Sequence, residues 1–305
     1  MFVCFDVIFD DDLIRRLELE KKKNVYISSY SETVKGLKKS LNDKIKIKIE
    51  NKLINGKDVQ NSWFPDLKET EIDVFLSHSH QDIEYVRSFA GWLKKELDVT
   101  TFIDSDLWLN IRDLEHDLGK DLNKEKYIRG IKFYDYDNTR LMLQHTNNML
   151  VVALQQMIDK AESVFFLNSR ESVPINQDEI MNATYSPWIY TELSCTNIIR
   201  RKPLVCYREL DTYMEYMLES FAKSKQGEEC LNIHIAYPLD FRKFISISAE
   251  DLYYWKFEEL CTGQREKYPL DALYKKLYTS GWREFGEHIK MGKRNIQRII
   301  NLYDN

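Results

Sequence analysis

The fold class is decided by residues 72–103, which read IDVFLSHSHQDIEYVRSFAGWLKKELDVTTFI. Residues 72–76 form a short apolar run that predicts a buried strand, and a polar loop follows at 77–82. Residues 83–97 then place apolar side chains three or four positions apart, which predicts an amphipathic helix. Residues 99–103 predict a second strand, and a strand, a helix and a strand at this spacing indicate a parallel sheet.

The same sheet is expected to continue along the chain. Further apolar runs predict a third strand at 163–168, a fourth at 203–207 and a fifth at 231–237. Helices are expected around these strands, over residues 141–158, 188–199, 214–223, 252–260, 270–278 and 289–302. The sequence therefore predicts an α/β fold with a parallel five-stranded sheet flanked by helices.

The chain is expected to divide into three parts around this sheet. Residues 1–68 are predicted to be an α+β extension, in which the first nine residues are either a strand or an anchoring tail. Within it, the alternation of Lys and Ile at 44–49 predicts a strand that closes a hairpin at Asn55-Gly56, unless the stretch continues a helix. Residues 69–245 form the main domain, with a charged insertion at about 109–138, and 246–305 form a helical C-terminal segment.

Composition limits the classes of function. The 305 residues carry a net charge of −5, so the chain lacks the basic excess that is typical of nucleic-acid binding. The five cysteines are odd in number and widely spaced, and no signal peptide precedes them, so we expect a reduced, cytoplasmic protein. No apolar run approaches the ~20 residues that cross a bilayer. We therefore expect neither a membrane nor a nucleic-acid partner.

The most informative short segment is 186–192, Ser-Pro-Trp-Ile-Tyr-Thr-Glu, at the start of a predicted helix. Ser186 is a good N-cap, and Pro187 then falls at the first helical position, where its missing N–H is not needed. In that register Trp188 and Glu192 lie four apart on one helix face. A second face, which can pack on the sheet, carries Ile189, Leu193 and Thr196. The segment is either a site built from a carboxylate and an aromatic ring or an exposed Glu below a half-buried Trp.

Two polar loops leave the carboxyl ends of the first two predicted strands, where open α/β sheets bind ligands. In the loop at 77–82, His78, His80 and Asp82 have metal-binding side chains. No helical His pair and no Cys pair completes a metal set, so no metal is expected. Ser79 and Asp82 are candidates for capping the following helix, which is the role we favour for Asp82, while Ser77 and His78 are candidates for lining a pocket.

The second loop, 104–108, reads Asp-Ser-Asp-Leu-Trp. Its two acids lie near Trp108 and could meet a ribose or a cation. On the residues alone, the simpler interpretation is a polar loop anchored by Trp108. Elsewhere the sequence contains no Gly-rich phosphate loop and no Gly-x-Ser-x-Gly elbow, which disfavours phosphoryl transfer and serine hydrolysis.

Three of these blocks together resemble a bacterial version of the TIR (Toll/interleukin-1 receptor) domain, over about residues 72–237. Residues 73–82 resemble the first strand of the family with its Phe-x-Ser and trailing Asp, and residues 101–105 resemble the second strand and the loop after it. Residues 186–193 resemble the Ser-x-Trp-x-x-x-Glu-Leu motif, which is the specific block. Two departures are the loop after Phe102, which lacks the Gly and Pro often found there, and the insertion.

The resemblance implies an NAD glycohydrolase or cyclase that cleaves the nicotinamide–ribose bond. It assigns the catalytic carboxylate to Glu192 and the wall of the nicotinamide-ribose pocket to Trp188. The other substrate-binding residues that we expect are Ser77, His78, Asp104, Trp108 and Tyr185. NAD is the substrate, so no cofactor and no metal are expected. The product would be ADP-ribose, or a cyclic or conjugated form that acts as a signal.

The same resemblance implies a role in antiphage defence. The partners that we expect are NAD, further copies of the chain, and a downstream effector protein that senses the nucleotide product. Two alternatives remain open from the sequence. One is a TIR module that assembles without catalysis, and the other is an enzyme similar to the nucleoside deoxyribosyltransferases, which use a related fold and also a Glu.

Overall fold

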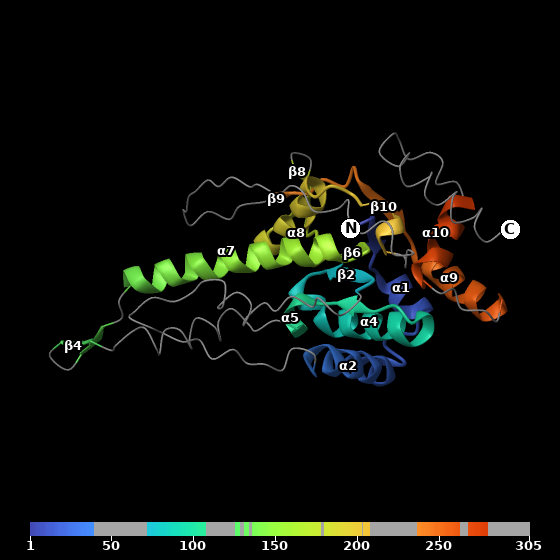
Figure 1. The fold of residues 1–305 in the computed structure, drawn as a ribbon, viewed down its shortest axis with the longest axis horizontal. Helices are drawn as coiled ribbons and strands as arrows, with labels where there is room; N and C mark the ends of the chain where they lie inside the picture. The colour runs from blue at the N-terminus through green and yellow to red at the C-terminus, as the bar shows by residue number, and fades with distance from the viewer. Residues whose placement is uncertain are drawn as a thin grey trace, which may run out of the picture.

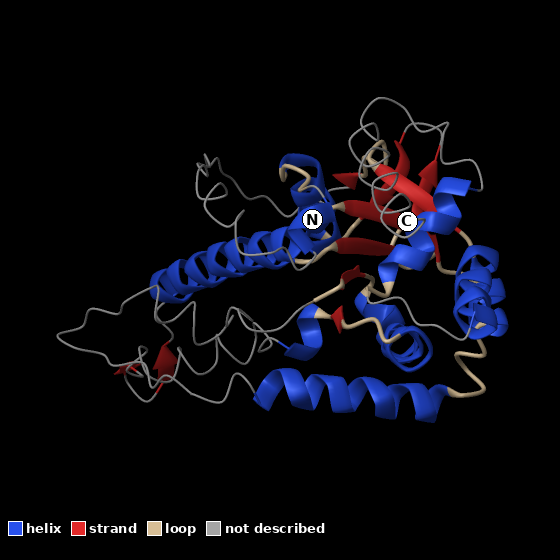
Figure 2. Ribbon diagram, turned by 45° about the vertical axis from the view of Figure 1, so that its right-hand side comes forward, coloured by secondary structure: helices blue, strands red, loops and turns tan. Residues whose placement is uncertain are grey.

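The centre of the protein is a parallel five-stranded sheet with helices on both faces (Figures 1 and 2). The computed structural model describes residues 1–39, 72–107, 126–128, 131–133, 136–177, 180–202, 204–207, 237–262 and 268–279. The strand order is β10-β1-β6-β2-β3, and each of the four pairings is parallel. The strands are β1 (Val3–Ile8), β2 (Val74–Ser77), β3 (Thr101–Phe102), β6 (Ser163–Asn168) and β10 (Phe244–Ile247). The predicted sheet type is therefore confirmed.

Each face of the sheet has its own apolar core. One core lies under the helices α1 (Asp11–Arg16), α2 (Lys23–Lys39), α4 (Ile83–Leu97), α9 (Ala249–Thr262) and α10 (Leu270–Thr279). The other lies under α7 (Tyr136–Lys160) and α8 (Pro187–Ile198). Neighbouring strand residues alternate between the two, so Val74 and Leu76 enter the first core and Phe75 enters the second. Burial on both faces explains why the strands are nearly continuous apolar runs.

The first nine residues contain a strand of the sheet, which decides between the two interpretations left open above. Strand β1 lies between β6 and β10, inside the sheet and next to its edge strand, although it belongs to the segment that we assigned to an N-terminal extension. Helix α2 of the same segment packs along α4. The N-terminal segment therefore contributes to the same core as residues 72–103.

The fourth predicted strand is not part of this sheet, and most of the fifth lies outside the described residues. Residues 204–207 form a 3-10 helix, η2 (Leu204–Tyr207), because a short apolar run does not by itself distinguish a strand from a helical turn. Of the run 231–237, only Tyr237 lies among the described residues. It begins β9 (Tyr237–Pro238), which pairs antiparallel with β8 (Ile180–Thr184) in a small sheet completed by β7 (Ile175–Gln177). The corresponding places in the main sheet are held by β1 and β10.

The other predicted elements divide into confirmed and undescribed ones. Helices α4, α7, α8, α9 and α10 and strands β2, β3 and β6 lie where the periodicity predicts them, within a few residues. In the insertion, β4 (Lys126–Ile128) and β5 (Ile131–Phe133) pair antiparallel. Several predicted features fall outside the described residues: the strand at 44–49 with its hairpin, the helices at 214–223 and 289–302, and Trp108. Within the described ranges, no helix combines the length and the apolar character needed to span a bilayer.

The connections make a switch point between β2 and β6. From β2 the chain passes through α4 to β3 at one edge, whereas from β6 it passes through α8 toward β10 at the other edge. The carboxyl ends of two neighbouring strands whose connections leave in opposite directions form a crevice in open α/β sheets, and ligands bind there. The fold thus indicates the carboxyl ends of β2 and β6, at Ser77 and Asn168, as the place to look for a site.

Helices α2 and α4 approach each other closely at Gly91. A Cβ atom added at Gly91 would lie 1.8 Å from the backbone oxygen of Tyr26. Ser88, one turn earlier on α4, donates a hydrogen bond to the backbone oxygen of Leu19, with 2.7 Å between the oxygens. Only a residue without a side chain allows this contact between the two backbones.

We predict that Gly91→Ala lowers the free energy of unfolding by about 1–3 kcal/mol, or prevents folding, because the two helices must move apart. Gly36→Ala is the matched control in α2, since nothing lies within 4 Å of its added Cβ. That change should raise stability by up to about 1 kcal/mol through helix propensity. Urea unfolding measures both variants, and equal effects at the two glycines would contradict the close contact.

Candidate active site

The start of α8 has the predicted cap. The Ser186 hydroxyl accepts a hydrogen bond from the backbone N–H of Ile189, with 3.3 Å between the atoms, and Pro187 occupies the first turn. Ile189 and Leu193 are buried in the core under α7 and α8, as predicted for the sheet-facing side of the helix. This cap and this packing fix which way Glu192 points.

Glu192 is buried and contacts the end of a strand far away in the sequence. Only 5 % of its surface is exposed. The hydroxyl of Ser77, the last residue of β2, donates a hydrogen bond to Glu192 Oε2, with 2.6 Å between the oxygens. Ser77 itself is fully buried. The interpretation of Glu192 as an exposed surface carboxylate is therefore wrong.

The environment of Glu192 disfavours its charged form. Burial raises its pKa well above the ordinary value, and the nearby charge of Asp104 raises it further. The hydrogen bond from Ser77 acts in the opposite direction, because it stabilises the carboxylate. No lysine or arginine of the described residues contributes to this shift. Buried carboxylates are usually paired with a cation, so an unpaired one marks a candidate functional group.

Asp104 is held in place by an ion pair two residues away. It begins the short helix α5 (Asp104–Leu107), which follows β3. Arg87 of α4 donates from Nε to both carboxylate oxygens of Asp106, over 3.1 and 3.0 Å, and also from Nη2. Burial raises the pKa of the Tyr30 hydroxyl on α2, and the nearby charge of Asp106 raises it further. This network anchors α5 and with it the charge that faces Glu192.

Of the other predicted site residues, the structure describes Trp188, His78 and Tyr185, and Trp108 lies outside the described residues. Trp188 is half-buried and packs against the core under α7 and α8, one turn before Glu192 on the same helix. His78 is half-buried, and its Nδ1 lies 3.2 Å from the backbone oxygen of Leu76. Tyr185 is 56 % exposed. The structure therefore brings Ser77, Asp104 and Glu192 together.

The loop after β2 differs from expectation in its capping residue. Ser79, not Asp82, caps the turn that precedes α4, through a 3.4 Å hydrogen bond from the backbone N–H of Gln81. Asp82 instead accepts a 2.6 Å hydrogen bond from the hydroxyl of Ser169, which follows β6. That partner is distant in sequence, so local capping rules could not include it. In the described part of the chain, no three His, Cys, Asp or Glu side chains gather as metal ligands.

Sequence reasoning missed Asp6, a polar residue near the same edge of the sheet. It lies on β1, is half-buried, and accepts a 3.0 Å hydrogen bond from the side-chain amide of Asn168 at the end of β6. Burial raises its pKa. The sequence does single out this position, because Asp6 is the one charged residue in the apolar run of residues 1–9.

The centre suits chemistry in which positive charge develops. A carboxylate held by one hydroxyl, largely shielded from water and without a cation, can stabilise a cationic transition state, attack an electrophilic carbon or accept a proton. Comparisons of the chain with protein-family models, curated proteins and solved structures found no match.

We predict that Glu192→Gln stabilises the fold at neutral pH, because it removes a buried ionisable group and keeps an amide that Ser77 can hydrogen-bond. The raised pKa of Glu192 means that the folded state holds this proton more tightly than the unfolded chain. The stability of the wild type therefore falls as the pH rises from the unfolded pKa of about 4.3 toward the folded value. The gain from Gln, about 1–3 kcal/mol, should appear at neutral pH and vanish near about pH 4.

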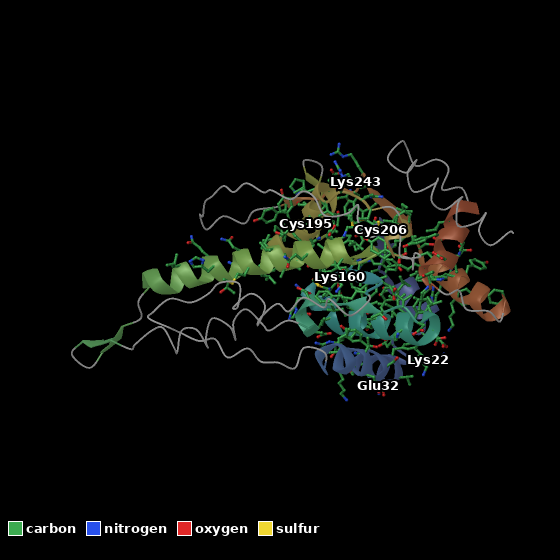
Figure 3. All side chains as sticks on the ribbon, viewed as in Figure 1. Lys22, Glu32, Lys160, Cys195, Cys206 and Lys243 are labelled. Atoms are coloured by element: carbon green, nitrogen blue, oxygen red, sulfur yellow. The ribbon has the colours of Figure 1, made fainter. Side chains whose placement is uncertain are left out.

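Denaturant unfolding at the two pH values measures this difference. Glu32→Gln, on the exposed side of α2 (Figure 3), is the matched control and should give no gain. Destabilisation by Glu192→Gln at neutral pH would show that the charged carboxylate is a structural requirement rather than a burden on the fold.

Proposed function

We propose that this chain is a TIR-type enzyme that cleaves the nicotinamide–ribose bond of NAD. The observation that carries the proposal is the buried carboxyl of Glu192, hydrogen-bonded by Ser77 at the switch point of a parallel sheet and not paired with any lysine or arginine of the described residues. The sequence blocks that resemble the TIR family supply these same two residues. The products would be nicotinamide and ADP-ribose, or a cyclic or conjugated form of ADP-ribose.

Cleavage of the nicotinamide–ribose bond does not require the enzyme to protonate the leaving group. Nicotinamide is attached through a cationic nitrogen, so it departs with the bonding electron pair as a neutral molecule. A sugar leaving group needs a general acid, but this one does not. The developing charge lies instead on the ribose ring, as an oxocarbenium ion. One carboxylate below C1′ can stabilise this ion, and water or a hydroxyl of the substrate then attacks C1′ and loses its proton.

The surroundings of Glu192 suit this role. Ser77 holds Oε2 and so orients the carboxyl group, which leaves Oε1 for the substrate. A cationic pyridinium next to the buried carboxyl lowers its pKa, because opposite charges attract strongly where water is excluded. Substrate binding would thus favour the ionised form, which the protein's own groups disfavour. Trp188, on the same face of α8, would form the wall against the nicotinamide ring.

The wider role rests on the sequence resemblance alone. Antiphage defence, self-association, a downstream effector and a cytoplasmic location are what the resemblance implies. The strand order differs from the flavodoxin-like order that the resemblance to the TIR family implies. In that order the position next to one edge is held by the fourth strand along the chain, whereas here it is held by β1, the first strand. Asp104 remains in the proposed substrate site together with His78, Trp108 and Tyr185.

We predict that the purified protein releases nicotinamide from NAD and that Glu192→Gln lowers the rate at least about a hundredfold, because a neutral amide cannot balance the ribosyl cation. Nicotinamide release should be followed over a range of protein concentrations, since the enzyme is expected to self-associate. Glu32→Gln is the control that removes the same charge from an exposed site on α2 and should keep the wild-type rate.

Three outcomes separate the proposal from its alternatives. Release that depends on Glu192 supports NAD cleavage. Self-association without release at any concentration would favour the assembly module. Release of a free base from deoxynucleosides, but not from NAD, would favour the deoxyribosyltransferase-like enzyme.

A further inference from the structure

Asp6 lies in the same row of the sheet as Ser77. Asp6 is paired with Phe166 across β1 and β6, and Ser77 is paired with the same Phe166 across β2 and β6. Residues paired in this way in a parallel sheet point to the same face. The Cα atoms of Asp6 and Ser77 are therefore two strand spacings apart, roughly 10 Å, on the face covered by α8. Glu192 stands over the row at Ser77, and Asp6 lies two strands away, next to Ser246 of the edge strand β10.

Among the described residues, the surroundings of Asp6 contain no cation that would pair with a carboxylate. Its neighbours on β1, Phe5 and Val7, are fully buried in the apolar core of the opposite face. Asn168 donates its one hydrogen bond, and no cation of the described residues contributes to its pKa shift. Burying a charge without a cation is unfavourable, and an Asn or an apolar residue would fit the strand without that penalty. A carboxylate kept in such a place is a candidate binding group.

Asp6 is also more open to a ligand than Glu192. Both Asp6 and Asn168 are half-buried, whereas Ser77 and Glu192 are buried. Beyond Asp6, the last residue of β1, Ile8, is 43 % exposed. The side of the row at Asp6 therefore lies toward the solvent, since its β10 neighbour Ser246 is also exposed, and the reacting side lies below α8.

These positions match the two ends of a dinucleotide. NAD has a second ribose, in its adenosine half, joined to the first through a flexible pyrophosphate. A carboxylate accepts hydrogen bonds from the two hydroxyls of a ribose, and it repels a phosphate attached to one of them. NADP differs from NAD by such a phosphate, on the 2′-hydroxyl of the adenosine ribose.

We infer that Asp6, oriented by Asn168, binds the adenosine ribose of the substrate and selects NAD over NADP. This inference rests on the proposed function, because it takes NAD as the molecule that reaches Glu192. It concerns binding alone and involves no bond-breaking step. The selection should weaken toward acidic pH, since burial raises the pKa of Asp6 and protonation removes the repulsion.

The test measures binding of NAD and NADP to the full chain carrying Glu192→Gln, so that neither ligand is consumed. Titration calorimetry gives the two dissociation constants with Asp6 intact and with Asp6→Asn. We expect NADP to bind at least about tenfold more weakly than NAD when Asp6 is present, and the two to bind within about threefold of each other in Asp6→Asn. Glu171→Gln removes one charge from the exposed turn after β6 and should leave the tenfold ratio unchanged.

The outcomes distinguish this inference from the proposed function. If NAD binds but the NAD-to-NADP ratio is the same with Asp6→Asn, Asp6 does not contact the adenosine ribose and the inference fails, while NAD cleavage stands. If the ratio changes as expected but wild-type protein releases no nicotinamide, the inference holds for binding and the proposed cleavage fails. If neither dinucleotide binds, the inference fails, and nicotinamide release by the wild-type protein decides the proposed function separately.

Discussion

The hydrogen bond from Ser77 to the buried carboxyl of Glu192 connects the sheet to α8, and the candidate site depends on it. Its two residues are 115 positions apart in the sequence, so it forms only when β2 and α8 are both in place. The end of β2 fixes the hydroxyl, and the cap at Ser186 with Pro187 fixes the register of the helix. The carboxyl group is thereby removed from water, with Asp104 disfavouring its charge and Ser77 favouring it. Because these two effects oppose each other, a cation that enters the site can shift the protonation of Glu192.

The segment before residue 40 builds much of the frame around this interaction. Strand β1 holds the sheet together between β6 and β10, and it carries Asp6 to the same edge as Ser77. Helix α2 packs so closely on α4 that position 91 has no room for a side chain. Through Arg87 and Asp106, α4 anchors the helix that carries Asp104. The N-terminal segment is thus connected to the site through packed elements.

Local patterns in the sequence predicted those elements that depend on interactions between residues close together in the chain. The periodicity of 83–97 and the apolar run at 163–168 gave α4 and β6, and cap chemistry gave the register of α8. The place of β1 in the sheet could not be predicted, because strand order depends on pairings between distant segments. Strand β10 has only four residues, and the run at 204–207 is equally short, so neither pattern separates a strand from a helical turn. The residue pattern singled out Glu192 and Ser77, but their contact and the burial of Glu192 depend on the tertiary structure.

We propose that Glu192 is a buried carboxyl whose pKa is raised in the free protein and falls when a cationic substrate binds. Carbon NMR of protein labelled at the glutamate side-chain carboxyl, assigned with Glu192→Gln, measures its titration directly. The ligand is a carbocyclic NAD analogue, in which the ribose ring oxygen is replaced by carbon, so that the pyridinium charge is kept and the bond is not cleaved. The account predicts a raised pKa for Glu192 in the free protein and a lower one in the complex. An ordinary pKa in the free protein, or a raised one that the bound analogue leaves unchanged, would contradict it.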